Sequence, residues 1–76
     1  MDDIEFSELK HSIYFLGDIL KKRRLHLNLT QDVLAFEAGI SRSTLSLIEN
    51  NKPCNTKDVK KVILALTGIG ILRSTT

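Results

Sequence analysis

The sequence predicts an all-α domain of four to five short helices, and two observations carry that prediction. Apolar residues recur at three- and four-residue spacing in four separate segments, which is the pattern of helices that bury one face. Residues that start or stop helices stand between these segments, among them Thr30, Gly39, Ser41 and Pro53. A chain of 76 residues suffices for one such domain. It buries only about 60 to 65% of its unfolded surface, so dimerisation would help its stability.

The first predicted helix follows an N-terminal extension, residues 1–11. Ser12 is a suitable N-cap, because its hydroxyl can accept a hydrogen bond from a free amide of the first turn. The helix should end at about His26. Its buried stripe is expected to consist of Ile13, Leu16, Leu20 and Leu27.

Two shorter helices, residues 31–38 and 42–49, are predicted next, with a tight turn between them. Thr30 and Ser41 are good N-caps. Gly39 suits the position just after the first of these helices, where a left-handed backbone conformation is needed. The residues expected to face inward are Val33, Leu34, Ala38, Leu45 and Ile48.

The last predicted helix begins after Thr56, beyond a polar loop at residues 50–53, and ends at Gly68. The residues expected to face inward are Val59, Val62, Ile63 and Leu66. Residues 69–73 are too few for another helix and are rich in β-branched residues and glycine, so they are predicted to form a short strand. The predicted domain therefore covers residues 12–68, and residues 69–76 are a C-terminal strand and tail.

Charge is unevenly distributed along the chain, although the net charge is only +2. Four of the nine acidic residues precede every basic residue, so the chain from Lys10 onward carries 11 basic and five acidic residues. That asymmetry favours contact with phosphate groups. For an individual lysine, and for the run Lys21, Lys22 and Arg23, the sequence leaves a solvated surface open as the alternative.

Several classes of protein are disfavoured by what the sequence lacks. Cys54 is the single cysteine, no Cys/His cluster has zinc-site spacing, and no nucleophile or phosphate-loop motif is present. We therefore expect neither an enzyme nor a bound metal or cofactor, with His11 and His26 at the surface near helix ends. No apolar run is long enough to cross a membrane, and the acidic N-terminus is unlike a signal peptide, which predicts a cytoplasmic protein.

A family resemblance is carried by five features that follow one another along the chain. They are Thr30-Gln31, Leu34-Ala35, Gly39, Ser41 and residues 48–52, IENNK. Together they resemble the phage repressor and Cro class, or XRE class, of helix-turn-helix regulators over roughly residues 16–66. The resemblance implies a lambda-repressor-like fold that binds double-stranded DNA as a homodimer on a pseudo-palindromic operator and represses transcription.

Base contacts are expected from the second helix of the module, whose N-terminal residues lie nearest the base edges in the major groove. The candidates are Arg42, Ser43, Ser46 and Leu47. Arg42 can donate two parallel hydrogen bonds to guanine O6 and N7, with a phosphate contact as the alternative. Leu47 stands where the resembling regulators more typically carry a polar residue. It could pack on a thymine methyl group, or turn toward the core or a protein partner.

Phosphate contacts are expected from the ends of the module, and the candidates are Thr30, Gln31, Ser41, Thr44, Asn51 and Lys52. At the start of residues 31–38, free amides and the helix dipole favour an anion. The resemblance assigns phosphate contact to Gln31, Thr44, Asn51 and Lys52. It also pairs Arg24 with Glu49 as a structural brace.

Two functions of different classes remain open. The first is a homodimeric transcription regulator, and the second is a protein-interaction module in which DNA binding is secondary. Residues 16–17, 29–31 and 48–53, followed by a terminal strand, are similar to HipB-type antitoxins. Those regulators repress their own operon and bind a kinase toxin, and their C-terminal strands can pair across the dimer. The similarity implies a kinase-type toxin as partner.

Overall fold

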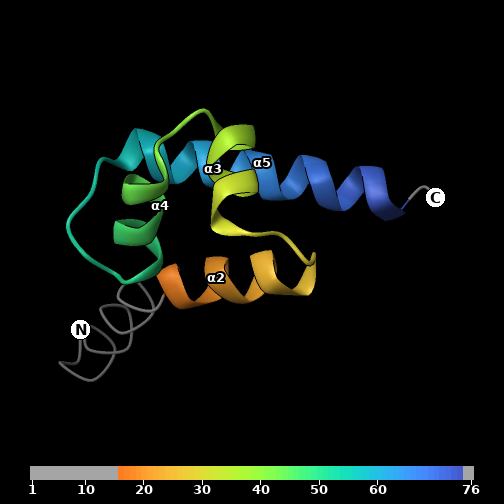
Figure 1. The fold of residues 1–76 in the computed structure, drawn as a ribbon, viewed down its shortest axis with the longest axis horizontal. Coiled ribbons are helices and arrows are strands. Elements are labelled where there is room, and N and C mark those ends of the chain that lie inside the picture. Colours follow the sequence, from red (N-terminus) through yellow and green to blue (C-terminus); the bar gives the residue numbers. More distant parts are fainter. Residues whose placement is uncertain (1–15, 75–76) are drawn as a thin grey trace, which may run out of the picture.

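Four helices make up the part of the chain that the computed structural model describes, residues 16–74 (Figure 1). They are α2 (Leu16–His26), α3 (Gln31–Ala38), α4 (Arg42–Glu49) and α5 (Thr56–Ser74). The predicted all-α class is confirmed, as are the bounds of α3 and α4 and the end of α2 at His26. The predicted helix start at Ser12 and the N-terminal extension lie outside the described residues.

The helices pack so that every one of them touches α4 or α5. α3 contacts α4 and α5, α2 contacts the same two helices, and α4 also contacts α5. In Figure 1, α2 and α5 lie on opposite sides of the view, with α3 and α4 between them. The C-terminal half of α5 extends beyond α3, toward the right of the view (Figure 1).

The turn between α3 and α4 forms as its residue types predict. The Thr30 hydroxyl accepts a hydrogen bond from the Val33 amide at 3.2 Å, and the Ser41 hydroxyl accepts one from the Thr44 amide at 3.0 Å. Gly39 has φ of 72°, in the left-handed region. Since a side chain is strained there, glycine lets α3 end and α4 begin within a few residues.

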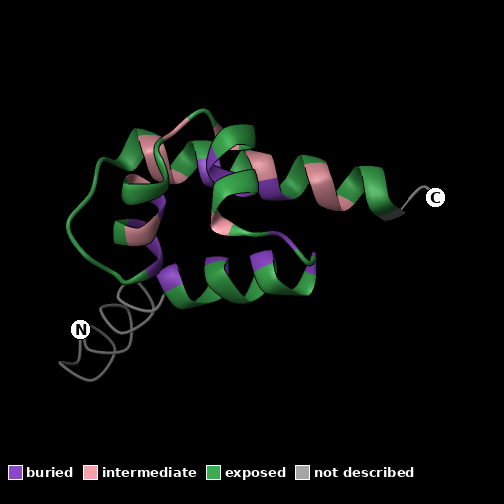
Figure 2. Ribbon diagram, viewed as in Figure 1, coloured by how far each residue is buried: buried purple, intermediate pink, exposed green. Residues whose placement is uncertain are grey.

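The core lies where the inward faces of all four helices and the α2–α3 connection meet (Figure 2). Its buried apolar residues are Leu20, Leu27, Leu29, Leu34, Ala35, Leu45, Ile48, Val62 and Leu66. Three residues that were expected in the core are instead partly exposed: Val33 is 46% exposed, Ile63 39% and Leu16 37%. Val33 directly precedes the fully buried Leu34, and Ile63 directly follows the fully buried Val62. Because successive residues of a helix are rotated by about 100°, Val33 and Ile63 lie toward the surface.

The predicted C-terminal strand is wrong, because residues 69–74 continue α5 beyond Gly68. The inward helical spacing of Val62 and Leu66 extends to Ile69, which packs against the core. Arg73, one turn further, donates a hydrogen bond to the Leu27 carbonyl. This packing outweighs the weak helix propensity of glycine and β-branched residues.

Candidate nucleic-acid interface

The exposed face of α4 and the first residue of α3 enclose a shallow hollow of about 450 Å³. Its lining residues are Gln31, Arg42, Ser43, Ser46 and Leu47. All four side chains predicted to contact bases thus lie together, next to Gln31, which is predicted to contact a phosphate. Leu45 and Ile48, on the opposite face of α4, are buried in the core and fix which face points outward.

Leu47 lies on the outward face and is 45% exposed. The alternative in which this leucine turns toward the core is therefore wrong. A thymine methyl group and an apolar surface of a protein partner remain as the two chemistries that an exposed leucine at this place can meet.

The hydroxyl groups at the starts of α3 and α4 already act as helix caps. Thr30 and Ser41 each accept an amide hydrogen bond, and the Ser41 and Thr44 hydroxyl oxygens lie 2.8 Å apart. A capping hydroxyl uses an oxygen lone pair and keeps its own hydrogen available. Capping therefore leaves the Thr30 hydroxyl able to donate to a phosphate oxygen, whereas one hydroxyl of the Ser41–Thr44 pair donates to the other.

A buried network connects α2, α3 and the end of α4 at Glu49. Arg24 donates from Nε to Glu49 Oε2 at 2.7 Å and from Nη2 to Glu49 Oε1 at 3.1 Å. It also donates from Nη1 to the Leu29 carbonyl at 2.8 Å. Both charged side chains are buried, so this bidentate pair is shielded from water and salt.

Gln31 belongs to the same network, which the sequence did not predict. Its Nε2 donates to Glu49 Oε1 at 3.0 Å, while the residue remains half-buried at the rim of the hollow. A carboxamide nitrogen carries two hydrogens, so one N–H is held by Glu49 and the other can donate outward. The buried pair thereby orients a surface side chain.

Asn51 and Lys52 lie apart from this hollow, in the loop after α4. Asn51 adopts φ of 58°, the left-handed conformation that asparagine tolerates. Its Oδ1 accepts a hydrogen bond from the Gly17 amide at 2.8 Å, which ties the loop to the start of α2. Both loop residues line a second hollow of about 510 Å³ with Leu16, Pro53 and Cys54 among others.

Gly17 is required for this attachment. A Cβ atom at that position would lie 2.2 Å from the Ile48 carbonyl oxygen and 2.7 Å from Asn51 Oδ1. The backbones of α2 and α4 therefore approach more closely than any side chain permits. No local sequence pattern indicates this contact, because Gly17 and Asn51 are 34 positions apart.

Asp32 contacts Arg42 across the two helices of the module, and no pattern in the sequence indicates this contact. Its Oδ2 lies 3.5 Å from Arg42 Nη1, and both side chains are well exposed, 69% and 65%. The pair joins the first turn of α3 to the first residue of α4. No helical spacing rule links residues on two different helices, so only the tertiary structure reveals it.

Other chemistry is limited within residues 16–74. No group of three or more His, Cys, Asp or Glu side chains there is placed to hold a metal ion. Cys54 is exposed with a free thiol. In the same stretch, none of the helices combines the length and apolar character that crossing a membrane requires.

Comparison with known proteins bears on the same four helices. A family model described as helix-turn-helix, HTH_3, matches residues 20–67, which run from α2 through α3 and α4 into α5. Searches of curated proteins and of solved structures found no match. In this motif α3 and α4 are the two helices joined by the turn, and the second of them is the recognition helix. The chain therefore belongs to the HTH_3 family of XRE/Cro-like helix-turn-helix domains and is a DNA-binding regulator.

Proposed function

We propose that this protein is a transcriptional repressor that binds a pseudo-palindromic operator as a homodimer, with α4 of each copy in the major groove. The observation that carries the proposal is the outward face of α4, where Arg42, Ser43, Ser46 and Leu47 line one hollow. Repression follows from occupying a promoter.

The proposed contacts divide between bases and the DNA backbone. Arg42 reads guanine through two donors, Ser43 and Ser46 adapt to neighbouring base edges directly or through water, and Leu47 packs on a thymine methyl group. Gln31 and the amides at the start of α3 hold a phosphate on one side of the groove. The candidates for the remaining phosphate contacts are Thr30, Ser41, Thr44, Asn51 and Lys52.

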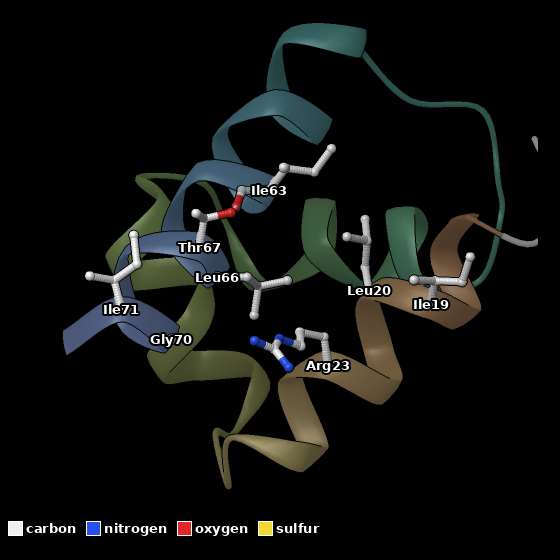
Figure 3. Close-up of a pocket in the computed structure, with 8 residues that line it drawn as sticks. All are labelled: Ile19, Leu20, Arg23, Ile63, Leu66, Thr67, Gly70 and Ile71. Atoms are coloured by element: carbon white, nitrogen blue, oxygen red, sulfur yellow. Dashed lines mark hydrogen bonds between the residues drawn. The ribbon is translucent and has the colours of Figure 1, made fainter. Parts of the chain in front are cut away.

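The outer surface of α5 supports the homodimer, in place of the strand that the sequence predicted. Four large apolar side chains of this helix are exposed: Ile63, Leu64, Ile71 and Leu72. Ile63 and Ile71 also line a hollow of about 430 Å³ between α5 and α2, with Ile19 on the α2 side (Figure 3). A patch of this kind marks a protein contact.

A second copy of the chain fits this patch because the patch is self-complementary. Gly68 is exposed, and nothing lies within 4 Å of the position of an added Cβ atom. Leu64 and Leu72 stand about one helical turn before and after it. Two α5 helices that cross antiparallel at Gly68 therefore place Leu64 of each copy against Leu72 of the other, as a two-fold interface requires.

The HipB-type alternative receives no support from the C-terminal end of α5. Its strand pairing required residues 69–73 to be extended, and they are helical. Binding of a kinase-type toxin thus rests on the sequence resemblance alone. Co-purification with the product of the neighbouring reading frame distinguishes the two functions: a bound kinase-like protein favours the antitoxin, and the regulator alone favours the simple repressor.

Selection of bound sequences from a random DNA pool tests the proposal directly. The expected product contains two inverted half-sites whose centres are about 34 Å, one helical turn, apart. Affinity for the selected site should fall steeply as salt rises, because phosphate contacts release counterions. Failure to enrich any sequence, with no DNA binding even at low ionic strength, contradicts the proposal.

A further inference from the structure

We propose that Asp32 is a positioning residue for Arg42 and thereby helps to set the base specificity of the recognition helix. The proposal rests on the base-reading role of Arg42 proposed above. It starts from the contact between Asp32 Oδ2 and Arg42 Nη1 at 3.5 Å, which joins α3 to α4. Arg42 itself lines the hollow on the outward face of α4.

The geometry leaves the reading edge of the guanidinium free. Asp32 engages Nη1, so Nε and Nη2 keep their hydrogens for another acceptor. These two atoms form one straight edge of the planar group. Two parallel donors on one edge are what guanine O6 and N7 accept. The carboxylate can therefore hold Arg42 while Arg42 binds a base.

Conformational entropy explains why holding Arg42 matters. Arg42 is the first residue of α4 and is 65% exposed, and an unrestrained arginine at such a place explores many rotamers that binding must freeze. A neighbour that restricts the rotamers before binding lowers this cost. An exposed ion pair contributes little to folding stability, so the contact is better suited to orienting Arg42 than to stabilising the fold.

The negative charge of Asp32 also favours base contact over phosphate contact. Arg42 and Asp32 together are neutral, so the pair is attracted to the phosphate backbone less strongly than an isolated arginine would be. Hydrogen bonding to a base edge depends on the positions of the donors, so it is retained although Asp32 offsets the charge of Arg42. Asp32 thus weakens binding to DNA in general while it preserves the sequence-dependent part.

Asp32 has a second interaction that the experiment must separate from the first. It lies in the first turn of α3, where a carboxylate is stabilised by the helix dipole. Its removal can therefore loosen α3. Glu37 provides a matched control, because it is an exposed acid on the same helix for which the structure gives no contact with Arg42.

The test measures, in the full chain, the ratio of affinities for the selected operator and for a scrambled duplex. Asp32→Asn should lower this ratio roughly three- to tenfold, part of the discrimination that one bidentate contact provides, and Asp32→Glu should restore it. Glu37→Gln should leave the ratio unchanged. Both charge-removing variants should bind scrambled DNA somewhat more tightly.

The decisive comparison repeats Asp32→Asn in an Arg42→Ala background. If Asp32 acts through Arg42, the ratio in that background does not fall further, whereas loss of a purely structural role lowers it in both backgrounds. An equal fall in both backgrounds, or an unchanged ratio for Asp32→Asn alone, overturns the proposal. Should Arg42→Ala itself leave the ratio unchanged, the base-reading role fails and the positioning role falls with it.

Discussion

Arg42 and Lys52 are both exposed cations of the DNA-binding module, but their surroundings differ. Arg42 lines the hollow on the outward face of α4, whereas Lys52 lies in the loop beyond α4, beside Asn51 and Pro53. A side chain at the base edges affects specificity, and a side chain at the backbone affects affinity for every sequence. The two positions should therefore respond differently to the same substitution.

Arg42→Ala is expected to reduce the preference for operator over scrambled DNA by about 5- to 150-fold, which corresponds to 1 to 3 kcal/mol. Lys52→Ala is expected to weaken both duplexes alike and to lower the salt slope of log affinity by about 1. Fluorescence anisotropy titrations at several salt concentrations measure both effects. The assignment would be reversed if Lys52→Ala changed the preference and Arg42→Ala did not.

Arg24 and Glu49 act at the residue scale as well, but on stability. Arg24→Met leaves the Glu49 carboxylate buried without its ion pair, and the free energy of unfolding should fall by about 3 to 5 kcal/mol. Lys61→Met removes the more exposed pair with Asp58, whose atoms are 3.8 Å apart, and should cost less than about 1 kcal/mol. Urea unfolding compares the two. Equal losses would show that burial adds nothing to the Arg24 pair.

At the scale of the element, Gly17 of α2 and Gly68 of α5 differ in how much space surrounds them. A Cβ atom on Gly17 would collide with the Ile48 carbonyl, whereas one on Gly68 would meet nothing within 4 Å. Glycine inside a helix is destabilising by roughly 0.5 to 1 kcal/mol relative to alanine unless close packing requires it. The same substitution should thus have opposite effects in the two helices.

Gly17→Ala is expected to destabilise the fold by about 1 to 3 kcal/mol, because the α2–α4 approach must open. Gly68→Ala is expected to stabilise the monomer by about 0.4 to 1 kcal/mol. Thermal unfolding at a protein concentration low enough to keep the chain monomeric measures both. A gain in stability for Gly17→Ala would mean that α2 can shift away from α4 without loss.

The elements also show which parts of the structure are encoded locally. Thr30, Gly39 and Ser41 act on backbone groups within a few residues of themselves. Together with the apolar spacing, they therefore predicted where α3 starts and ends and where α4 starts. The extension of α5 past Gly68 depends on contacts of Ile69 and Arg73 with the core and with Leu27. Propensity cannot anticipate such contacts, and the strand prediction was wrong for that reason.

The candidate site divides in the same way. The outward placement of Arg42, Ser43 and Ser46 follows from the burial of Leu45 and Ile48, which helical periodicity predicts. Contacts between separate helices, such as Asp32 with Arg42 and Gln31 with Glu49, have no local signature. They require the relative positions of α3 and α4.

At the scale of the whole molecule, the exposed apolar side chains are not all equivalent. Leu64 lies in the apolar patch of α5, and Phe36 projects from α3 with 82% of its surface exposed. Among the described residues, 16–74, the proposed two-fold interface uses the α5 patch around Gly68 and not Phe36. A charge introduced at Leu64 should therefore affect association, and a charge at Phe36 should not.

Leu64→Glu is expected to shift the protein from dimer to monomer in sedimentation equilibrium, because two like charges would meet apolar surface at the two-fold interface. Phe36→Glu serves as the control and should leave the mass unchanged. Operator affinity of Leu64→Glu should fall with dimerisation, since each half-site is then bound separately. A Leu64→Glu protein that remains dimeric would place the interface elsewhere.

The free thiol of Cys54 has a practical consequence for measuring this assembly. It is the single cysteine of the sequence, it is exposed, and it follows α4 in the loop that α2 holds through Gly17 and Asn51. A spin label or fluorophore can therefore be attached at one defined position without any change to the natural sequence. Two copies on one operator would carry two labels, and the distance between the labels would report the spacing of the two DNA-binding modules in solution.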